Sequence, residues 1–187
     1  MFRNKQVLGI ITARGGSKRI PRKNLIDLNG KPLIYWTIAV AQENQYIDRV
    51  IVSTDDSEIA AFSRAYGVET PFKRPKALST DDASSMDVIA HALTELEFDR
   101  YIVLLQPTSP LRTSGDIDIG FQFMEDTALF AAVSIGHSNA NRNGSVYISQ
   151  VDQFMIQKEF RPAVAFQTWS DINIDTYEDL RNAAKEM

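Results

Sequence analysis

A basic, glycine-containing segment is the part of this sequence best suited to chemistry. Five cationic side chains fall within the ten positions from Arg14 to Lys23, in a chain whose formal net charge is −4. The adjacent Gly15 and Gly16 allow the backbone to approach a bulky anion, while Arg and Lys donate charge-assisted hydrogen bonds to phosphate oxygens. The segment therefore predicts a phosphate-binding loop, and the alternative is a solvated turn that is merely basic.

The common phosphate-loop patterns are absent. The segment has neither the Gly-x-x-x-x-Gly-Lys-Ser/Thr spacing of NTPases nor the Gly-x-Gly-x-x-Gly spacing of dinucleotide-binding proteins. The chain also contains no cysteine, which excludes thiol catalysis, a Cys-ligated zinc and a disulfide scaffold.

The elements that must position this loop follow from the hydrophobic pattern. Apolar runs typical of strands buried on both faces are residues Val7–Thr12, Arg49–Ser53, Tyr101–Leu105 and Leu129–Val133. Segments with helical spacing lie between them, at Leu33–Glu43, Ser57–Tyr66, Ser84–Leu96 and Asp116–Met124. This alternation predicts an α/β fold of the three-layer, Rossmann-like type with a mostly parallel sheet. Short further strands are expected at Ser145–Ile148 and Ala163–Phe166.

Ligands of open α/β sheets bind at the carboxyl ends of the strands. The loops expected there are Ala13–Asn24, Thr54–Asp56, Gln106–Thr113 and Ile172–Asp175. Helix starts are indicated by hydroxyl and carboxylate pairs spaced as capping boxes: Ser84 with Asp87, Thr113 with Asp116, and Thr176 with Asp179.

Length and charge limit the classes of partner. The 187 residues predict a single domain, residues 1–187, large enough to bury a core. The acidic balance disfavours nucleic acid and acidic membranes as partners. No apolar stretch is long enough to cross a bilayer, and the N-terminus lacks the profile of a secretory signal, so a cytoplasmic location is expected.

Several blocks, in one order, resemble the acylneuraminate cytidylyltransferases, the family of CMP-sialic acid synthetases and their pseudaminic and legionaminic relatives. The blocks are Ala13–Asn24, Asn29–Pro32, Ile51–Asp55, Arg74–Pro75, Asp82–Ser85, Leu105–Arg112, Asn143–Gly144 and Ile174–Thr176. The resemblance extends over nearly the whole chain.

The resemblance implies roles for individual positions. The residues expected at the triphosphate are Arg14, Gly15, Gly16, Ser17, Lys18, Lys23 and Asn24, with Arg14 and Lys18 as catalytic cations and Lys18 facing the α-phosphate. The residues expected at the cytosine and ribose are Arg74 and Ser84 or Ser85. Gln106 is expected at the sugar, with Arg112 supporting either the acidic ligand or the shape of the loop. Asp175 is expected to act in catalysis by binding the Mg²⁺ that accompanies CTP.

Two departures from the family affect the sugar and metal sites. The family usually carries a long insertion before the Asn143–Gly144 block, with sugar-recognition and dimerisation elements, whereas this chain has only a few residues there. Asn173 stands where the family typically has the first Asp of Asp-x-Asp, so one anionic ligand of the metal becomes a neutral carbonyl. Arg142 and Asn143 are the remaining candidates to meet the sugar carboxylate. The short region leaves a homodimer and a monomer both open.

The expected function is transfer of CMP from CTP to a nonulosonic acid, a small acidic sugar, with release of pyrophosphate. Two alternatives remain: a catalytically weak CTP-binding protein of the same fold, and a nucleotidyltransferase for another sugar.

Some side chains are expected to be structural. Asp55 and Asp56 are predicted to serve as turn and cap residues, and Asp175 has capping of the last helix as an alternative role. His91 and the group Phe121, Phe123 and Met124 are predicted to pack in the core. His137 has no assigned role.

Overall fold

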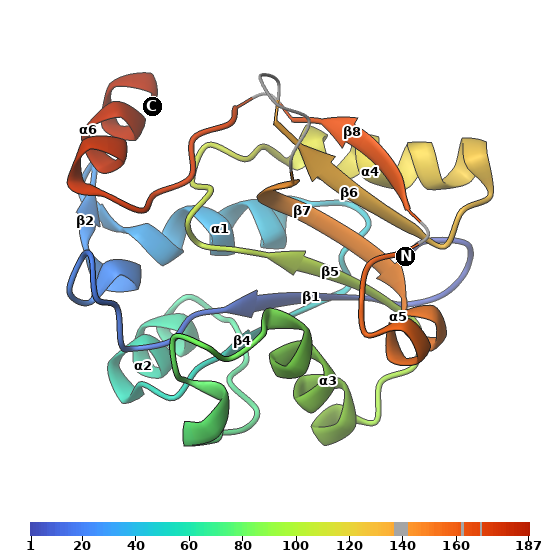
Figure 1. Cartoon of the computed structure of the whole chain (residues 1–187), viewed down its shortest axis with the longest axis horizontal. Coiled ribbons are helices and arrows are strands. Elements are labelled where there is room, and N and C mark those ends of the chain that lie inside the picture. Colours follow the sequence, from blue (N-terminus) through green and yellow to red (C-terminus); the bar gives the residue numbers. More distant parts are fainter. Residues whose placement is uncertain (137–141, 162, 169) are drawn as a thin grey trace.

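A computed structural model describes residues 1–136, 142–161, 163–168 and 170–187. Its main sheet has the strand order β4-β1-β5-β7-β6-β8. The strands are β1 (Val7–Thr12), β4 (Arg49–Ser53), β5 (Tyr101–Leu105), β6 (Ala131–Ile135), β7 (Arg142–Gln150) and β8 (Val164–Gln167). Strand β1 pairs in parallel with β4 and β5, and β6 with β8, whereas β7 runs antiparallel to both its neighbours (Figure 1).

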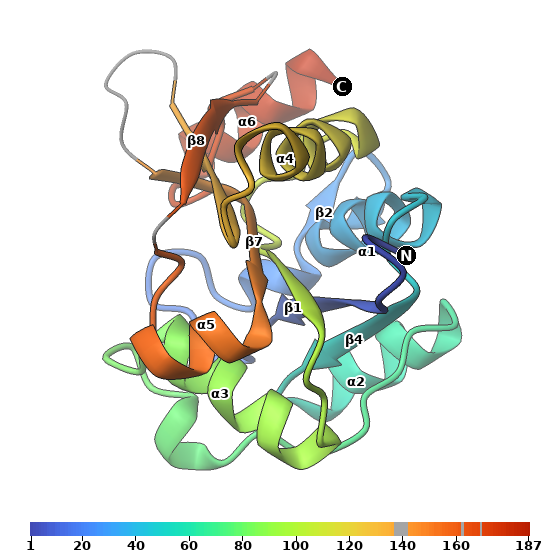
Figure 2. The ribbon, with the colours of Figure 1, turned by 90° about the vertical axis from the view of Figure 1, so that its right-hand side faces the viewer.

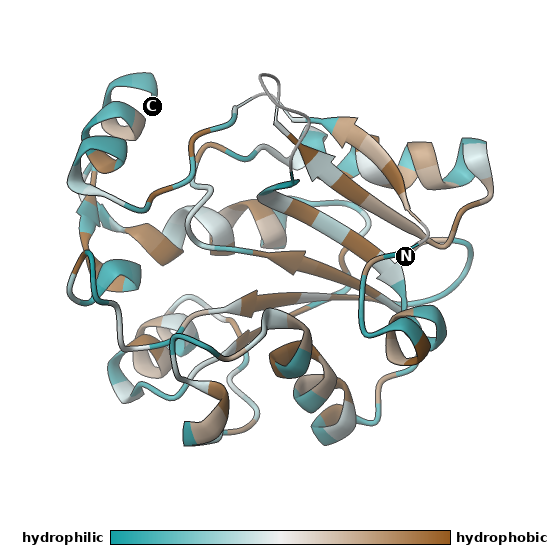
Figure 3. Ribbon diagram, in the orientation of Figure 1, coloured by the Kyte–Doolittle hydropathy of each residue, from teal (hydrophilic) through white to brown (hydrophobic). Residues whose placement is uncertain are grey.

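Helices cover both faces of the sheet, which confirms the predicted three-layer α/β class. Their bounds are α1 (Leu33–Glu43), α2 (Ser57–Ala65), α3 (Ser85–Leu96), α4 (Ser114–Thr127), α5 (Val151–Gln157) and α6 (Tyr177–Glu186). Helices α1, α2 and α4 lie on one face of the sheet, and α3 and α5 lie on the other (Figure 2). Their side chains form two separate core clusters with the two faces. Strands β1 and β5 are apolar along most of their length (Figure 3), as burial on both faces requires.

A third, smaller cluster lies apart from the two sheet faces. It joins Ile20 of the basic loop, Leu28 of the small β2–β3 hairpin, Ile174 and Ala183 of α6. The hairpin pairs β2 (Asp27–Leu28) with β3 (Lys31–Pro32) in antiparallel fashion. This cluster packs the C-terminal segment beside the basic loop.

The predicted elements agree with the observed ones to within a few residues. Strand β6, predicted at Leu129–Val133, is found at Ala131–Ile135, because α4 extends to Thr127 and ends with Ala128 in the left-handed region. Strand β7, predicted at Ser145–Ile148, extends over Arg142–Gln150. None of the helices in the described ranges combines the length and apolar content that a membrane span requires.

The caps agree with the sequence in two cases out of three. Both Thr113 with Asp116 and Thr176 with Asp179 form reciprocal capping boxes. Ser84 caps α3 by accepting from the Met86 N–H, but Asp87 does not complete a box. Asp175 is not the N-cap of α6, because Thr176 fills that position, so the capping role considered for Asp175 is wrong.

Candidate nucleotide-binding site

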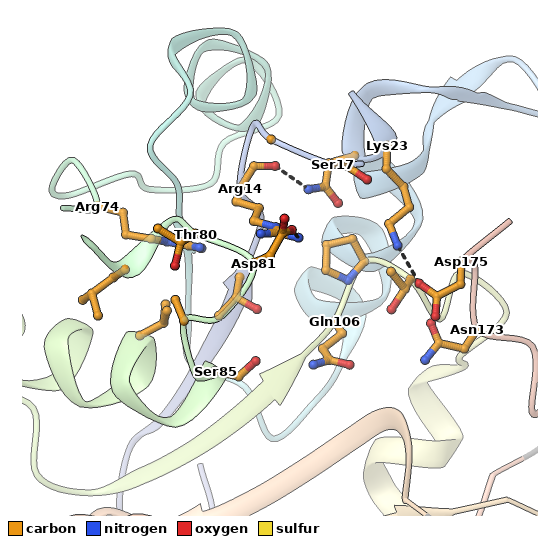
Figure 4. A pocket seen from close by; sticks show the side chains of 18 residues that line it. Arg14, Ser17, Lys23, Arg74, Thr80, Asp81, Ser85, Gln106, Asn173 and Asp175 are labelled. Atoms are coloured by element: carbon orange, nitrogen blue, oxygen red, sulfur yellow. Dashed lines mark hydrogen bonds and ion pairs between the residues drawn. The ribbon is translucent and has the colours of Figure 1, made fainter. Parts of the chain in front are cut away.

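A cavity of about 370 Å³ opens at the carboxyl ends of β1 and β5 (Figure 4). It is lined by Thr12, Arg14, Gly16, Ser17, Lys23, Asn24, Arg74, Leu78, Thr80, Asp81, Ala83, Ser85, Val88, Gln106, Pro107, Thr108, Asn173 and Asp175. A second hollow of about 340 Å³ shares five of these residues and adds Lys18 and Arg19. A cavity therefore lies at the strand ends where the sequence predicts a site, and most of the predicted site residues lie around it.

Backbone contacts fix the start of the basic loop. Asn24, a buried residue, donates from Nδ2 to the Arg14 carbonyl oxygen at 2.9 Å, and the Gly15 N–H donates to Asp55 Oδ1 at 3.0 Å. A β-carbon on Gly15 would lie 2.5 Å from a carboxylate oxygen of Asp56, so the turn requires glycine. Gly16 lines the cavity and faces open space, as expected of a residue that a ligand approaches. Gly15 does not line the cavity, and its N–H already donates to Asp55.

Two loop cations converge on one carboxylate. Arg14 forms a short ion pair with Asp81, and the Lys18 ammonium lies 2.5 Å from the other oxygen of the same carboxylate. The Lys18 hydrogen bond and then the Arg14 hydrogen bond hold the pKa of Asp81 below its usual range. Arg14 and Lys18 thus bind one anionic group together, and their contact with a phosphate stays a prediction.

A second set of cations converges on Asp175. Lys23 Nζ lies 3.1 Å from Asp175 Oδ1 and donates to the Ile174 carbonyl oxygen at 2.8 Å, and Arg19 lies 3.0 Å from Asp175 Oδ2. Lys23 and Asp175 line the first cavity opposite Arg14 and Asp81 (Figure 4). Arg22 instead pairs with Asp56 and Glu58, outside the cavity lining.

Arg74 is held rigidly at the wall of the cavity. It is only 4% exposed, its Nε donates to Ser53 Oγ at 3.1 Å, and its Nη2 donates to the Ser53 carbonyl oxygen. Burial lowers the pKa of Arg74 to about 10, with Asp55 opposing the shift and Arg14 adding to it. The guanidinium remains charged at neutral pH in a fixed orientation, which suits recognition of a planar base.

Of the two serines expected near the base, Ser85 lines the cavity and Ser84 does not. The Ser84 hydroxyl accepts the Met86 N–H as the N-cap of α3 and does not line the cavity, whereas Ser85 does. Ser84 therefore caps α3, and the contact of Ser85 with a ligand stays a prediction.

Gln106, Gly144 and Asn173 meet on the side of the cavity away from Arg74. A β-carbon on Gly144, whose φ is +78°, would lie 2.5 Å from Gln106 Oε1 and 3.2 Å from Asn173 Nδ2. A larger residue at 144 would push both side chains from the cavity wall. Within the described residues the Gln106 side-chain amide has no hydrogen-bond partner, so it is available to a ligand.

The Arg112 side chain joins two backbone segments. It is 5% exposed, its Nε donates to the Ser145 carbonyl oxygen at 2.7 Å, and its Nη2 donates to the Gln106 carbonyl oxygen at 2.7 Å. It does not line the cavity. Of the two roles expected for Arg112, its geometry favours support of the loop and excludes contact with a ligand in this cavity.

Arg142 and Asn143 also lie outside the cavity lining. The Asn143 amide accepts from Ser134 Oγ at 2.5 Å and donates to Thr168 Oγ1 at 2.7 Å, which ties together the ends of β6 and β8. The Arg142 side chain is exposed and its guanidinium lies 3.5 Å from the Phe160 carbonyl oxygen. Neither residue therefore lies where it could contact a sugar bound in this cavity.

The cavity offers few metal ligands. Within the described part of the chain, no three His, Asp or Glu side chains gather in positions that could hold a metal. Asp175 is 53% exposed at the cavity, and Asn173 beside it donates from Nδ2 to the Asn143 carbonyl oxygen at 3.4 Å, which leaves its Oδ1 unused. One carboxylate and one amide oxygen fit a Mg²⁺ whose other ligands come from phosphates and water.

The sequence of residues 8–129 matches the family model described as cytidylyltransferase. The chain belongs to the cytidylyltransferase family. It is 39% identical over 153 residues to the pseudaminic acid cytidylyltransferase of Campylobacter jejuni, and 41% identical over 112 residues to the N-acylneuraminate cytidylyltransferase of Escherichia coli. These matches confirm the resemblance drawn from the motif blocks.

The two matches cover 75% and 60% of this chain, but they cover only 66% and 26% of the length of the two relatives. Among solved structures, CMP:2-keto-3-deoxy-manno-octonic acid synthetase complexed with CTP superposes with a TM-score of 0.78 over 98% of both chains, at 22% identity. That likeness confirms the Rossmann-like fold.

Sequence reasoning missed part of the site. Thr80 and Asp81 line the cavity, and Asp81 is the partner of two predicted phosphate ligands. The only sequence signal was the acidic pair Asp81–Asp82 in a polar stretch, which does not indicate a partner in the basic loop.

Most of the predicted structural side chains are confirmed. Asp56 caps α2 by accepting the Glu58 and Ile59 N–H groups, and His91 packs edge-on against Phe72. Phe121 and Met124 are buried, but Phe123 is 41% exposed, so its assignment to the core is wrong. His137 lies outside the described residues.

Proposed function

We propose that this chain transfers CMP from CTP to a nonulosonic acid and releases pyrophosphate. The observation that carries the proposal is the cavity at the carboxyl edge of the sheet, where Arg14, Lys23 and Arg74 face one space in a member of the cytidylyltransferase family. Three cations at one cavity of an acidic protein fit a triphosphate better than they fit a neutral ligand.

In the proposed reaction the anomeric hydroxyl of the sugar attacks the α-phosphorus. A new P–O bond forms, the bond from the α-phosphorus to the bridging oxygen breaks, pyrophosphate leaves in line, and the hydroxyl proton passes to solvent. Arg14 and Lys18 stabilise the charge that develops on the phosphoryl oxygens. The protein contributes mainly by positioning the two substrates.

The base is proposed to bind between Arg74 and the start of α3. Ser85 offers a hydroxyl there, and Leu78, Ala83 and Val88 supply apolar contact surface. Arg74, fixed by Ser53, presents a rigid donor to a cytosine carbonyl oxygen. The sugar is proposed to bind beside Gln106.

Mg²⁺ is proposed as the cofactor, held by Asp175 and Asn173 together with phosphate oxygens. When bound, it would neutralise charge on the triphosphate. Lys23 and Arg19 hold the Asp175 carboxylate at the cavity without it.

The named activities of the relatives support the sugar class. The two relatives are named for pseudaminic acid and N-acylneuraminate. A cytoplasmic location, suited to a CTP-consuming enzyme, is part of the proposal, while the sequence leaves a homodimer and a monomer both open.

The test is pyrophosphate release with CTP, Mg²⁺ and a panel of sialic, legionaminic and pseudaminic acids. We expect turnover with at least one sugar and a loss of about 100-fold or more in kcat/KM in the double variant Arg14→Ala/Lys18→Ala. Arg100→Ala is the control, because it removes an exposed cation just before β5, at the opposite end of that strand. No release with any sugar in the wild type would contradict the proposal.

A second candidate is a CTP-binding protein without turnover. Asn173 favours it, since a neutral ligand weakens a metal site. Calorimetric binding of CTP with no turnover, and no gain in Asn173→Asp, would support this candidate.

A further inference from the structure

Asp81 occupies the place of an anionic ligand in the nucleotide-binding site. Its two carboxylate oxygens face Arg14 and Lys18, the two cations of the basic loop that the proposed reaction needs. The carboxylate is 32% exposed and lines both hollows of the site. A carboxylate and a phosphate accept the same charge-assisted hydrogen bonds, so they compete for one pair of donors.

Repulsion among the cations of the site explains why an anion lies between them when no ligand is bound. Arg14, Lys18, Lys23 and Arg74 surround the hollows, and Arg14 already contributes to the lowered pKa of Arg74. Without a counter-ion these cations would repel one another. Asp81 lowers that repulsion until a ligand with more negative charge arrives.

The backbone around Asp81 permits it to leave. Asp81 lies between the short 3-10 helix Lys76–Leu78 and the start of α3, in no helix or strand. Asp81 and Asp82 form a turn outside every helix and strand, so a shift of this segment disrupts no element. The ion pairs with Arg14 and Lys18 are what hold the side chain in the site.

We propose that Asp81 is an internal competitor for the triphosphate. It holds Arg14 and Lys18 in the ligand-free site, gives them up when the phosphates of CTP bind, and pairs with them again as pyrophosphate leaves. This inference rests on the proposed function and assigns Asp81 a part in ligand affinity and product release. It differs from a positioning role, in which Asp81 would keep both cations oriented while the nucleotide is bound.

The two roles predict opposite effects of Asp81→Asn. If Asp81 competes, removal of its charge tightens binding of polyphosphates, because the ligand no longer has to break two ion pairs. If Asp81 positions the cations, its removal weakens binding.

The experiment is calorimetric titration of wild type, Asp81→Asn and Asp82→Asn with inorganic tripolyphosphate, pyrophosphate and CTP. Asp82→Asn removes the same charge one residue along the chain, where Asp82 forms no ion pair with a described residue. We expect Asp81→Asn to bind all three ligands about five- to tenfold more tightly, and Asp82→Asn to stay within about twofold of wild type.

Unchanged or weaker binding by Asp81→Asn would overturn the inference. So would equal tightening in Asp82→Asn, since net charge alone would then explain the effect. A crystal structure of the wild type with tripolyphosphate gives a second measurement that needs no variant, and a carboxylate still paired with Arg14 and Lys18 there would also overturn it. Tripolyphosphate carries no base and needs no turnover, so failure of this inference and failure of the proposed function are distinguishable.

Discussion

The loop cations differ in burial, and this difference separates their roles. The Lys18 side chain is 84% exposed, and its one ion pair among the described residues is with Asp81, whereas the Lys23 side chain is 15% exposed and joins two groups of the C-terminal segment. Lys18 can therefore exchange one anion for another without disturbing the fold. Lys23 is part of the structure as well as part of the cavity lining.

Lys18→Met and Lys23→Met should therefore have different effects on stability. Lys23→Met leaves the Ile174 carbonyl oxygen without this donor and Asp175 paired with Arg19 alone, so we expect the free energy of unfolding to fall by about 1–3 kcal/mol. Lys18→Met should leave the urea midpoint unchanged, and both variants should bind CTP more weakly. Equal midpoints for the two variants would show that Lys23 has no structural role.

At the scale of elements, the turn after β1 depends on the start of α2. Gly15 approaches Asp56, and Asp56 is the N-cap of α2, which accepts the Glu58 N–H at 2.8 Å and the Ile59 N–H at 3.0 Å. The adjacent carboxylate, Asp55, accepts the N–H of Gly15 itself. The carboxyl ends of two neighbouring strands therefore fix the basic loop together.

Gly15→Ala and Gly16→Ala form a matched pair that tests this dependence. A methyl group at 15 collides with Asp56 and disturbs the cap, so we expect a loss of about 1–3 kcal/mol in the free energy of unfolding. A methyl group at 16 meets nothing within 4 Å, so stability should be retained, while CTP affinity falls because the methyl group enters the cavity. Chemical denaturation and calorimetry measure the two effects, and equal stability of both variants would contradict the account.

At the scale of the molecule, the site depends on a contact between distant parts of the chain. Ile20 of the basic loop and Ile174 beside Asp175 are both fully buried in the third core cluster. The backbone of Ile174 is also bonded to Thr108 O and to Lys23 Nζ. This packing, which also includes Ala183 of α6, places Asp175 at the cavity.

Ile174→Ala should consequently reduce stability and CTP binding together. We expect a loss of about 2–4 kcal/mol in the free energy of unfolding, with weaker CTP binding as Asp175 and Lys23 shift. Ile156→Ala, at a side chain that is 72% exposed on α5, should change neither quantity measurably. Normal CTP affinity in a clearly destabilised Ile174→Ala would show that the cluster does not position the site.

The sequence alone predicts the fold class and the edge of the sheet at which the cavity lies. Apolar runs such as Val7–Thr12 and periodic segments such as Leu33–Glu43 are read correctly because burial on both faces and helical period are local properties of the chain. The cationic loop was evident from composition, and the resemblance to a family supplied the expected roles of Arg74 and Gln106.

Only the tertiary structure decided which side chains meet. The pairing of Asp81 with Arg14 and Lys18, and that of Asp175 with Lys23 across 152 positions, depend on loops remote in sequence that the fold brings to one cavity. Burial of the Arg112 guanidinium follows from the same arrangement. Local patterns carry no information about such contacts, because the free energy that selects them comes from packing segments that are remote in sequence.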